Sequence, residues 1–197
     1  MSSSAETLAA RVATLAEEYR SGGDRAELIT GLLKVAESDD AAALLAAAEP
    51  YKEVPEIAGP LYERVVALEP ANARALVGLA SAYWLTGRGP EVVGQIAERA
   101  IAADPTNRGG WHMWALTEGD QRERTIRWRQ VSQRFPEDDL ARAALADNAA
   151  SLAAAEHDKE ARALALAEFE TLLDRATDLR QREAIEQALI TIKGWAW

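Results

Sequence analysis

The sequence has no cysteine among its 197 residues, and this absence removes several kinds of chemistry at once. Without cysteine the chain forms no disulfide, offers no thiol nucleophile and cannot build a zinc–thiolate site. Proline (7) and glycine (12) are sparse, and most of them lie between apolar segments, where they mark turns between helices. Aromatic residues make up only 6%, while alanine, the strongest helix former, is abundant. The composition therefore predicts an all-α protein.

Long apolar runs and an excess of positive charge are missing too. No stretch approaches the roughly 18 uninterrupted apolar residues that a membrane-spanning helix needs. The first residues lack the basic end and the continuous apolar core of a signal peptide, so we expect a cytoplasmic protein with no membrane partner. The 22 Lys and Arg against 32 Asp and Glu give a formal charge of −10, which disfavours nucleic acid as a partner for the whole surface.

Three prolines end amphipathic segments at regular intervals: Pro70, Pro105 and Pro136. Their separations of 35 and 31 residues are close to the period of about 34 residues found in one class of helix–turn–helix repeat. Two residues after each proline stands a side chain that can cap the next helix: Asn72, Asn107 and Asp138. Proline also prevents the preceding helix from continuing. The repeated pattern of a proline followed by a capping residue therefore predicts a series of helix pairs.

The residues between these prolines resemble the tetratricopeptide repeat, whose pattern is W-x-x-L-G-x-x-Y followed by A-x-x-x-F and a proline. Unit 72–107 follows the first half of this pattern with Leu76, Leu79, Ala80 and Tyr83, where Leu76 replaces the tryptophan and Ala80 the glycine. The unit before it supplies the second half, with Ala58-x-x-x-Tyr62 and then Pro70. On these residues the chain is similar to the tetratricopeptide family.

The resemblance implies an all-α, right-handed solenoid that forms a single domain over residues 1–197. We expect about five antiparallel helix pairs, with 72–107 the best unit and less regular pairs at 4–37, 40–70, 107–136 and 138–176. Segment 178–193 has apolar residues on one face and charges on the other, which is typical of a capping helix. Unit 108–136, rich in tryptophan and arginine, also resembles the half-a-tetratricopeptide repeats of RNA-processing proteins.

The bounds of the individual helices are predicted from the same signals, the prolines and the helix-capping residues. The expected spans are 4–20, 24–37, 40–49, 55–68, 72–86, 90–103, 107–117, 121–134, 138–156, 159–176 and 178–193. The second pair is irregular, because Pro50 and Pro55 crowd its turn.

In this family the first helix of each pair lines a concave groove that binds extended or helical peptides. The resemblance places the partner-binding groove at these positions: Val77, Ser81, Trp84, His112, Leu116 and Asp147. The i, i+4, i+7 spacing puts the first three on one helix face. Trp84 either anchors a partner side chain or packs against the irregular turn of the second pair, and both interpretations stay open.

Some family members bind the acidic tails of heat-shock chaperones with lysine, arginine and asparagine side chains at these groove positions. The residues here are different, so we disfavour that partner: Val77, Ser81, His112 and Leu116. We expect a protein-interaction scaffold whose protein or peptide partner is apolar or amphipathic.

Catalysis finds little support in the sequence. The two histidines, His112 and His157, are isolated from each other and from any metal-ligand or acid–base pattern. The acidic pairs at 39–40 and 138–139 stand at expected helix starts, where a carboxylate caps the N-terminus. The sequence also lacks a glycine-rich phosphate loop and a nucleophile elbow. We therefore expect no enzymatic activity, no metal and no cofactor.

Two further features suggest other functions. Arg122, Arg127 and Arg129 lie in a locally basic, tryptophan-rich segment. They can contact nucleic-acid phosphates or an acidic protein, although we favour a solvated helix face that covers the tryptophans. Trp195 and Trp197 end the chain beyond a glycine, and either fold back onto the capping helix or dock into a second copy. Self-association is thus the alternative to a partner-binding scaffold, and nucleic-acid binding is the weaker alternative.

Overall fold

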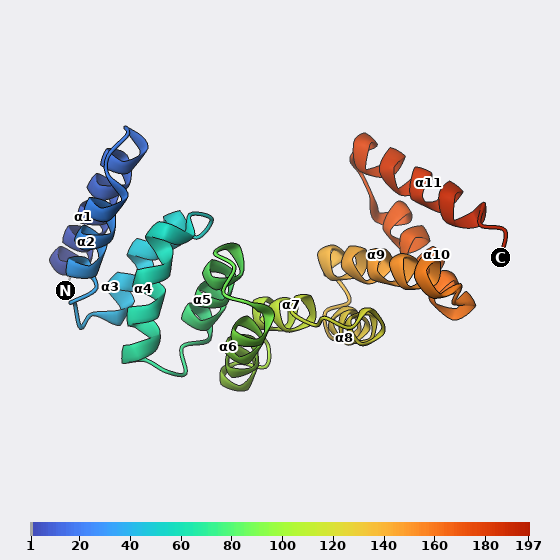
Figure 1. Cartoon of the computed structure of the whole chain (residues 1–197), viewed down its shortest axis with the longest axis horizontal. Coiled ribbons are helices and arrows are strands. Elements are labelled where there is room, and N and C mark those ends of the chain that lie inside the picture. Colours follow the sequence, from blue (N-terminus) through green and yellow to red (C-terminus); the bar gives the residue numbers. More distant parts are fainter. Residues whose placement is uncertain (1) are drawn as a thin grey trace. The chain divides into compact units, whose positions relative to one another are not determined.

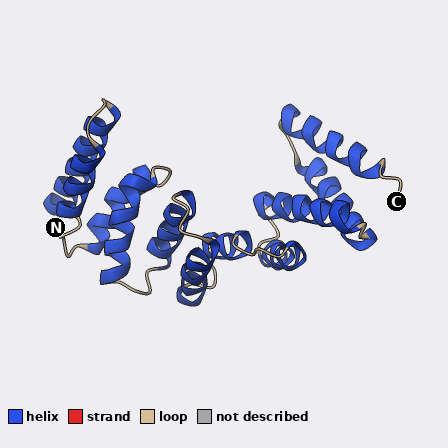
Figure 2. Ribbon diagram, viewed as in Figure 1, coloured by secondary structure: helices blue, strands red, loops and turns tan. Residues whose placement is uncertain are grey.

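The computed structural model describes residues 2–197, with side chains from Thr7 onward, and contains 11 α-helices, one short 3₁₀-helix and no strand within that range (Figures 1 and 2). The predicted all-α class is confirmed. The helices form two compact units, of which the first ends at Trp114 and the second runs from Ala115 to Trp197. The single domain over residues 1–197 stays a prediction. No helix in the described range is both long and apolar enough to span a membrane.

The first unit contains α1 to α6 and most of α7. The helix bounds are α1 Ser2–Arg20, α2 Arg25–Val35, α3 Ala41–Ala48, α4 Pro55–Leu68, α5 Ala73–Leu85, α6 Pro90–Ala103 and α7 Arg108–Leu116, with the 3₁₀-helix η1 at Glu49–Tyr51. The side chains of Asp24, Asp40 and Asn72 cap α2, α3 and α5 by accepting a backbone N–H hydrogen bond. Helices α4 and α6 begin with proline instead, which has no N–H to leave unsatisfied.

These helices pack in pairs, α1 with α2, α3 with α4 and α5 with α6. The pairs are joined by contacts of α1 with α3, α2 with α4, and α4 with α5. Large side chains such as Leu32, Leu44 and Leu76 are fully buried between the helices. The helices lie close together because alanines alternate with these leucines and valines at the contacts.

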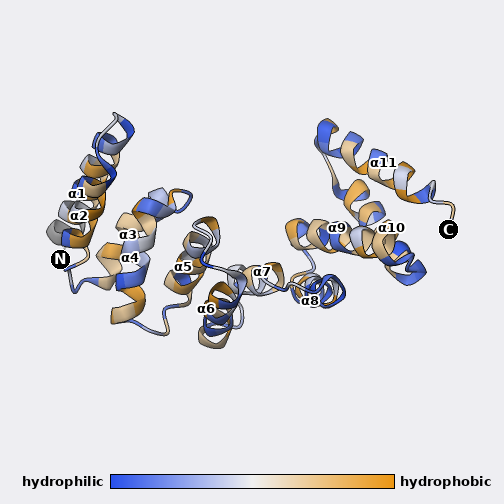
Figure 3. Cartoon of the chain, in the orientation of Figure 1, coloured by the Kyte–Doolittle hydropathy of each residue, from blue (hydrophilic) through white to orange (hydrophobic). Residues whose placement is uncertain are grey.

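The second unit contains α8 Gln121–Arg134, α9 Asp139–Glu156, α10 Lys159–Arg175 and α11 Leu179–Lys193. An aspartate caps each of these helices: Asp120, Asp138, Asp158 and Asp178. Helix α8 is hydrophilic along most of its length (Figure 3). Ile185, Leu189 and Ile192 of α11 are buried in one cluster with residues of α9 and α10, so α11 covers the apolar face of the last pair.

The observed helices agree with the expected spans, and no boundary differs by more than two residues. The irregularity expected in the second pair is present, because α3 has only 8 residues and passes into η1 at Pro50. The first helix of the fourth pair, α7, is also short at 9 residues. These two short helices belong to the pairs that precede and follow the pair of α5 and α6 along the chain.

Candidate functional site

Two of the groove residues predicted from the sequence line one cavity beside α5. Val77 and Ser81, one turn apart on this helix, are half-buried and border a cavity of about 370 Å³, called the α5 cavity below. Trp84 lies on the next turn and is 39% exposed, but it does not line the cavity. Of the three predicted groove residues of α5, Val77 and Ser81 thus adjoin a hollow and Trp84 does not, and their role in binding a partner stays a prediction.

Three other segments contribute polar side chains to the cavity wall. Its lining comprises Glu49, Lys52 and Glu53 around η1, Tyr62 of α4, Arg74, Val77, Gly78 and Ser81 of α5, and Asn107 before α7. The four charged side chains, two acidic and two basic, cancel in formal charge. Arg74 is paired with Glu49 at 2.9 Å. The charged groups of the lining thus carry no net charge, and the wall combines polar and apolar surface.

Tyr62 contributes the most deeply buried polar side chain of this cavity, being 2% exposed. Burial raises the pKa of its hydroxyl to about 12, and the carboxylates of Glu49 and Glu53 add to that effect while Arg74 opposes it. The hydroxyl is therefore protonated at neutral pH, so it can both donate and accept a hydrogen bond.

The repeat pattern placed Tyr62 at a core position and did not assign it to the groove. Tyrosine stands there where the family pattern has phenylalanine. That extra hydroxyl was the one signal in the sequence that pointed to a further role.

The other predicted groove residues lie apart from the α5 cavity lining. His112 is half-buried on α7, next to Met113, whose sulfur accepts a hydrogen bond from the Ser81 hydroxyl at 3.8 Å. Leu116 and Asp147 belong to the second unit. Asp147 lines a separate cavity of about 410 Å³ between α9 and α11, and burial raises the pKa of its carboxyl.

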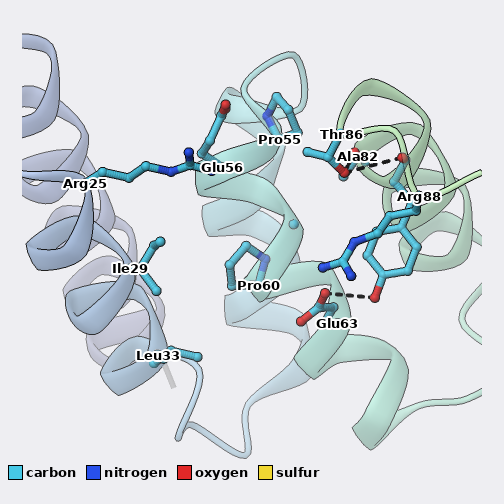
Figure 4. A pocket seen from close by; sticks show the side chains of 12 residues that line it. Arg25, Ile29, Leu33, Pro55, Glu56, Pro60, Glu63, Ala82, Thr86 and Arg88 are labelled. Carbon is cyan, nitrogen blue, oxygen red and sulfur yellow. Dashed lines mark hydrogen bonds between the residues drawn. The ribbon is translucent and has the colours of Figure 1, made fainter.

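A larger cavity, about 580 Å³, lies between α2, α4 and the end of α5 (Figure 4). Ile29 and Leu33 of α2 form an apolar wall, 38% and 57% exposed. On the opposite side the Tyr83 hydroxyl donates a hydrogen bond to Glu63 at 2.8 Å, and the Arg88 guanidinium lies 5.2 Å from the Tyr83 ring. None of the predicted groove residues borders this cavity, and no pattern in the sequence indicates it.

The arginines of the predicted basic patch are largely engaged with carboxylates of the second unit. Arg122 forms ion pairs with Glu156 at 2.5 Å and with Asp158 at 2.9 Å. Arg127 pairs with Glu118 at 2.6 Å, and Arg129 is exposed on α8. These pairs lower the positive potential that a phosphate backbone would meet.

The C-terminal tryptophans pack within the chain. Trp195 and Trp197 stack with ring centroids 5.5 Å apart and contact a cluster of α9 and α10 residues: Leu152, Ala153 and Ala161. Arg162 of α10 holds this tail, since its guanidinium donates hydrogen bonds to the carbonyls of Ile192 and Lys193 at 3.1 and 3.0 Å and lies 5.5 Å from the Trp197 ring. The tail therefore covers the second unit's own apolar surface.

Comparison with known proteins gives information on the fold. No protein-family model matches the chain. No curated protein matches it either. Among solved structures, MamA is 17% identical with a TM-score of 0.62, and the match covers 91% of this chain and 99% of MamA.

Two further structures are described as tetratricopeptide-repeat proteins. TTC0263 of Thermus thermophilus is 18% identical with a TM-score of 0.62, covering 91% of this chain and 97% of its own. YrrB, described as having an unusual peptide-binding site, is 17% identical with a TM-score of 0.59, covering 89% and 88%. With its paired helices and the repeat residues of unit 72–107, this chain has the all-α solenoid fold of the tetratricopeptide-repeat proteins.

Proposed function

We propose that the chain is a non-catalytic protein-interaction scaffold that binds a peptide, or an exposed segment of a protein, in the α5 cavity. The observation that carries this proposal is the cavity itself, which adjoins the first helix of the most regular pair and is lined by Val77 and Ser81. Its volume of about 370 Å³ falls within the range of about 300–1,000 Å³ typical of ligand pockets. The peptide-binding site named for YrrB supports the proposal by analogy of fold.

Replacing Ser81 by phenylalanine is expected to weaken peptide binding at least tenfold, because the larger side chain occupies the cavity that the peptide needs. The measurement starts with selection of binders to the unaltered chain from a displayed library of random twelve-residue peptides. The dissociation constants of the selected peptides are then compared between the unaltered and Ser81→Phe chains. Trp84→Ala, measured in parallel, shows whether the bound peptide extends to the exposed end of α5.

A matched control is Ser151→Phe on α9, which borders the second-unit cavity that contains Asp147. Circular dichroism melts of both variants separate lost binding from lost folding. Loss of binding in Ser151→Phe together with full binding in Ser81→Phe would place the site on α9 and contradict the proposal.

A further inference from the structure

The Tyr62 hydroxyl has no hydrogen-bond partner in the part of the chain whose side chains the structure describes. The Tyr62 side chain is 2% exposed as a whole, but its oxygen is accessible from the cavity, where water or a ligand can pair with it. Tyr83, the next tyrosine along the chain, instead donates to Glu63 at 2.8 Å. A ligand that displaces water from the Tyr62 hydroxyl must replace the hydrogen bond of that water, so the hydroxyl favours a ligand with a polar group.

The packing of α4 against α5 brings the hydroxyl end of Tyr62 to the cavity. A Cβ atom at position 78 would lie 2.5 Å from Cζ of Tyr62, the carbon that carries the hydroxyl. The absence of a side chain at Gly78 therefore makes room for the end of the ring. Gly78 and Ser81 border the same cavity as Tyr62, so the hydroxyl lies where a bound group reaches it.

The neighbouring polar groups provide both donors and acceptors. The Asn107 carbonyl oxygen accepts the N–H of Gly110 at 3.4 Å, which leaves the amide N–H groups of its side chain for a ligand. The Ser81 hydroxyl donates to Met113, which leaves its lone pairs to accept. Together with Tyr62, these groups complement a ligand that both donates and accepts hydrogen bonds.

The charges around the cavity favour a neutral ligand. Arg74 and Glu49 neutralise each other at 2.9 Å, and Lys52 and Glu53 on the rim carry opposite charges. A charged ligand would lose its hydration without meeting a net opposite charge. An apolar ligand would leave the hydroxyl of Tyr62 unpaired, and a site with such polar groups discriminates strongly against ligands that cannot pair with them.

We infer that the α5 cavity binds the carboxamide side chain of an asparagine or glutamine in a partner peptide, with the Tyr62 hydroxyl as its deepest hydrogen-bonding contact. A side chain is favoured over the peptide main chain, because Tyr62 is only 2% exposed and a narrow group reaches it more easily. The inference rests on the proposed function. The inference also differs from the apolar or amphipathic partner expected from the predicted groove residues. The difference arises because Tyr62 lies on α4 and was not among those residues.

The Tyr62→Phe variant tests this contact, because it removes one oxygen and retains the ring. The probes are pools of nine-residue peptides, randomised except for a central residue fixed as Asn, Gln, Glu, Lys or Leu. The unaltered chain is expected to bind the Asn or Gln pool about tenfold more tightly than the other three. In Tyr62→Phe this preference is expected to disappear, while the melting temperature does not fall, because no hydrogen bond within the chain is lost.

Tyr83→Phe is the matched control, since it removes the same atom from a hydroxyl that is paired with Glu63. That variant is expected to retain the carboxamide preference. Three results would overturn the inference: a preference for the Glu, Lys or Leu pool, an unchanged preference in Tyr62→Phe, or a lower melting temperature in Tyr62→Phe. If one of these three results is found and Ser81→Phe still abolishes binding of every pool, the inference fails but the proposed function stands. If no pool binds, or Ser81→Phe has no effect, the proposed function fails and the inference fails with it.

Discussion

Replacing Gly78 by alanine is expected to lower the free energy of unfolding by about 2 kcal/mol, although alanine is the better helix former. In an open helical position this substitution would favour the helix by about 1 kcal/mol. At position 78 the new Cβ would lie 2.5–2.6 Å from three carbons of the Tyr62 ring. The ring is itself buried, so it cannot move without disturbing the contact of α4 with α5. Urea unfolding followed by circular dichroism measures the change.

The control for this result is Gly119→Ala, where a Cβ would meet nothing within 4 Å. We expect that variant to change stability by less than about 0.5 kcal/mol. The double variant Gly78→Ala, Tyr62→Leu should lose less free energy of unfolding than the two single variants lose together. We expect a difference of about 1 kcal/mol or more, because the smaller leucine side chain leaves room for the Cβ at position 78. Strictly additive losses would contradict the close packing of Tyr62 under Gly78.

Replacing Glu168 by alanine is expected to cost about 3 kcal/mol of stability, because its ion pair in the second unit is largely buried. Arg142 and Glu168 face each other at 2.5 Å, and their side chains are only 14% and 18% exposed. Removal of the carboxylate leaves the guanidinium largely buried without its counter-charge, which costs far more than the loss of an exposed pair. Urea unfolding again provides the measurement.

Glu170 offers a comparison on the same helix, because its pair with Lys193 has a similar distance of 2.9 Å but side chains 54% and 56% exposed. Glu170→Ala is expected to cost less than about 1 kcal/mol. Equal losses in the two variants would show that burial does not determine the strength of these pairs.

The helices could be predicted closely because their ends depend on local chemistry. A capping side chain such as Asn72 satisfies N–H groups within three residues of itself, and a proline at position 90 starts a helix for reasons contained in one residue. The repeat spacing then identified the pairs, since each pair must bury its apolar face against its neighbours. None of this required contacts between distant parts of the chain.

The α5 cavity could be predicted only in part, because its wall is built from segments far apart in the sequence. Helical spacing identified Val77 and Ser81, which share a face of α5. Helical spacing also included Trp84, since periodicity shows which residues share a face but not where neighbouring segments leave a hollow. Tyr62 was missed as a site residue, because the position of its hydroxyl depends on the absence of a side chain at Gly78.

The C-terminal tail shows a similar limit. The two tryptophans suggested either intramolecular packing or contact with a second copy, and their apolar character alone did not decide between these. The structure shows contacts within the chain, among them those of Arg162, about 30 residues earlier, which binds the carbonyls at the end of α11, while contact with a second copy stays a prediction. An arginine in the first turn of a helix has no pattern that reveals such a partner.

The location of a bound peptide tests the proposed scaffold function most directly. A photo-reactive benzophenone side chain introduced in place of Lys52, on the rim of the α5 cavity, should form a covalent link to a selected peptide upon irradiation. The same group in place of Lys34, an exposed residue of α2 that does not border the α5 cavity, serves as the control. We predict a link from position 52 and none from position 34. A link from position 34 with none from position 52 would contradict the proposed function.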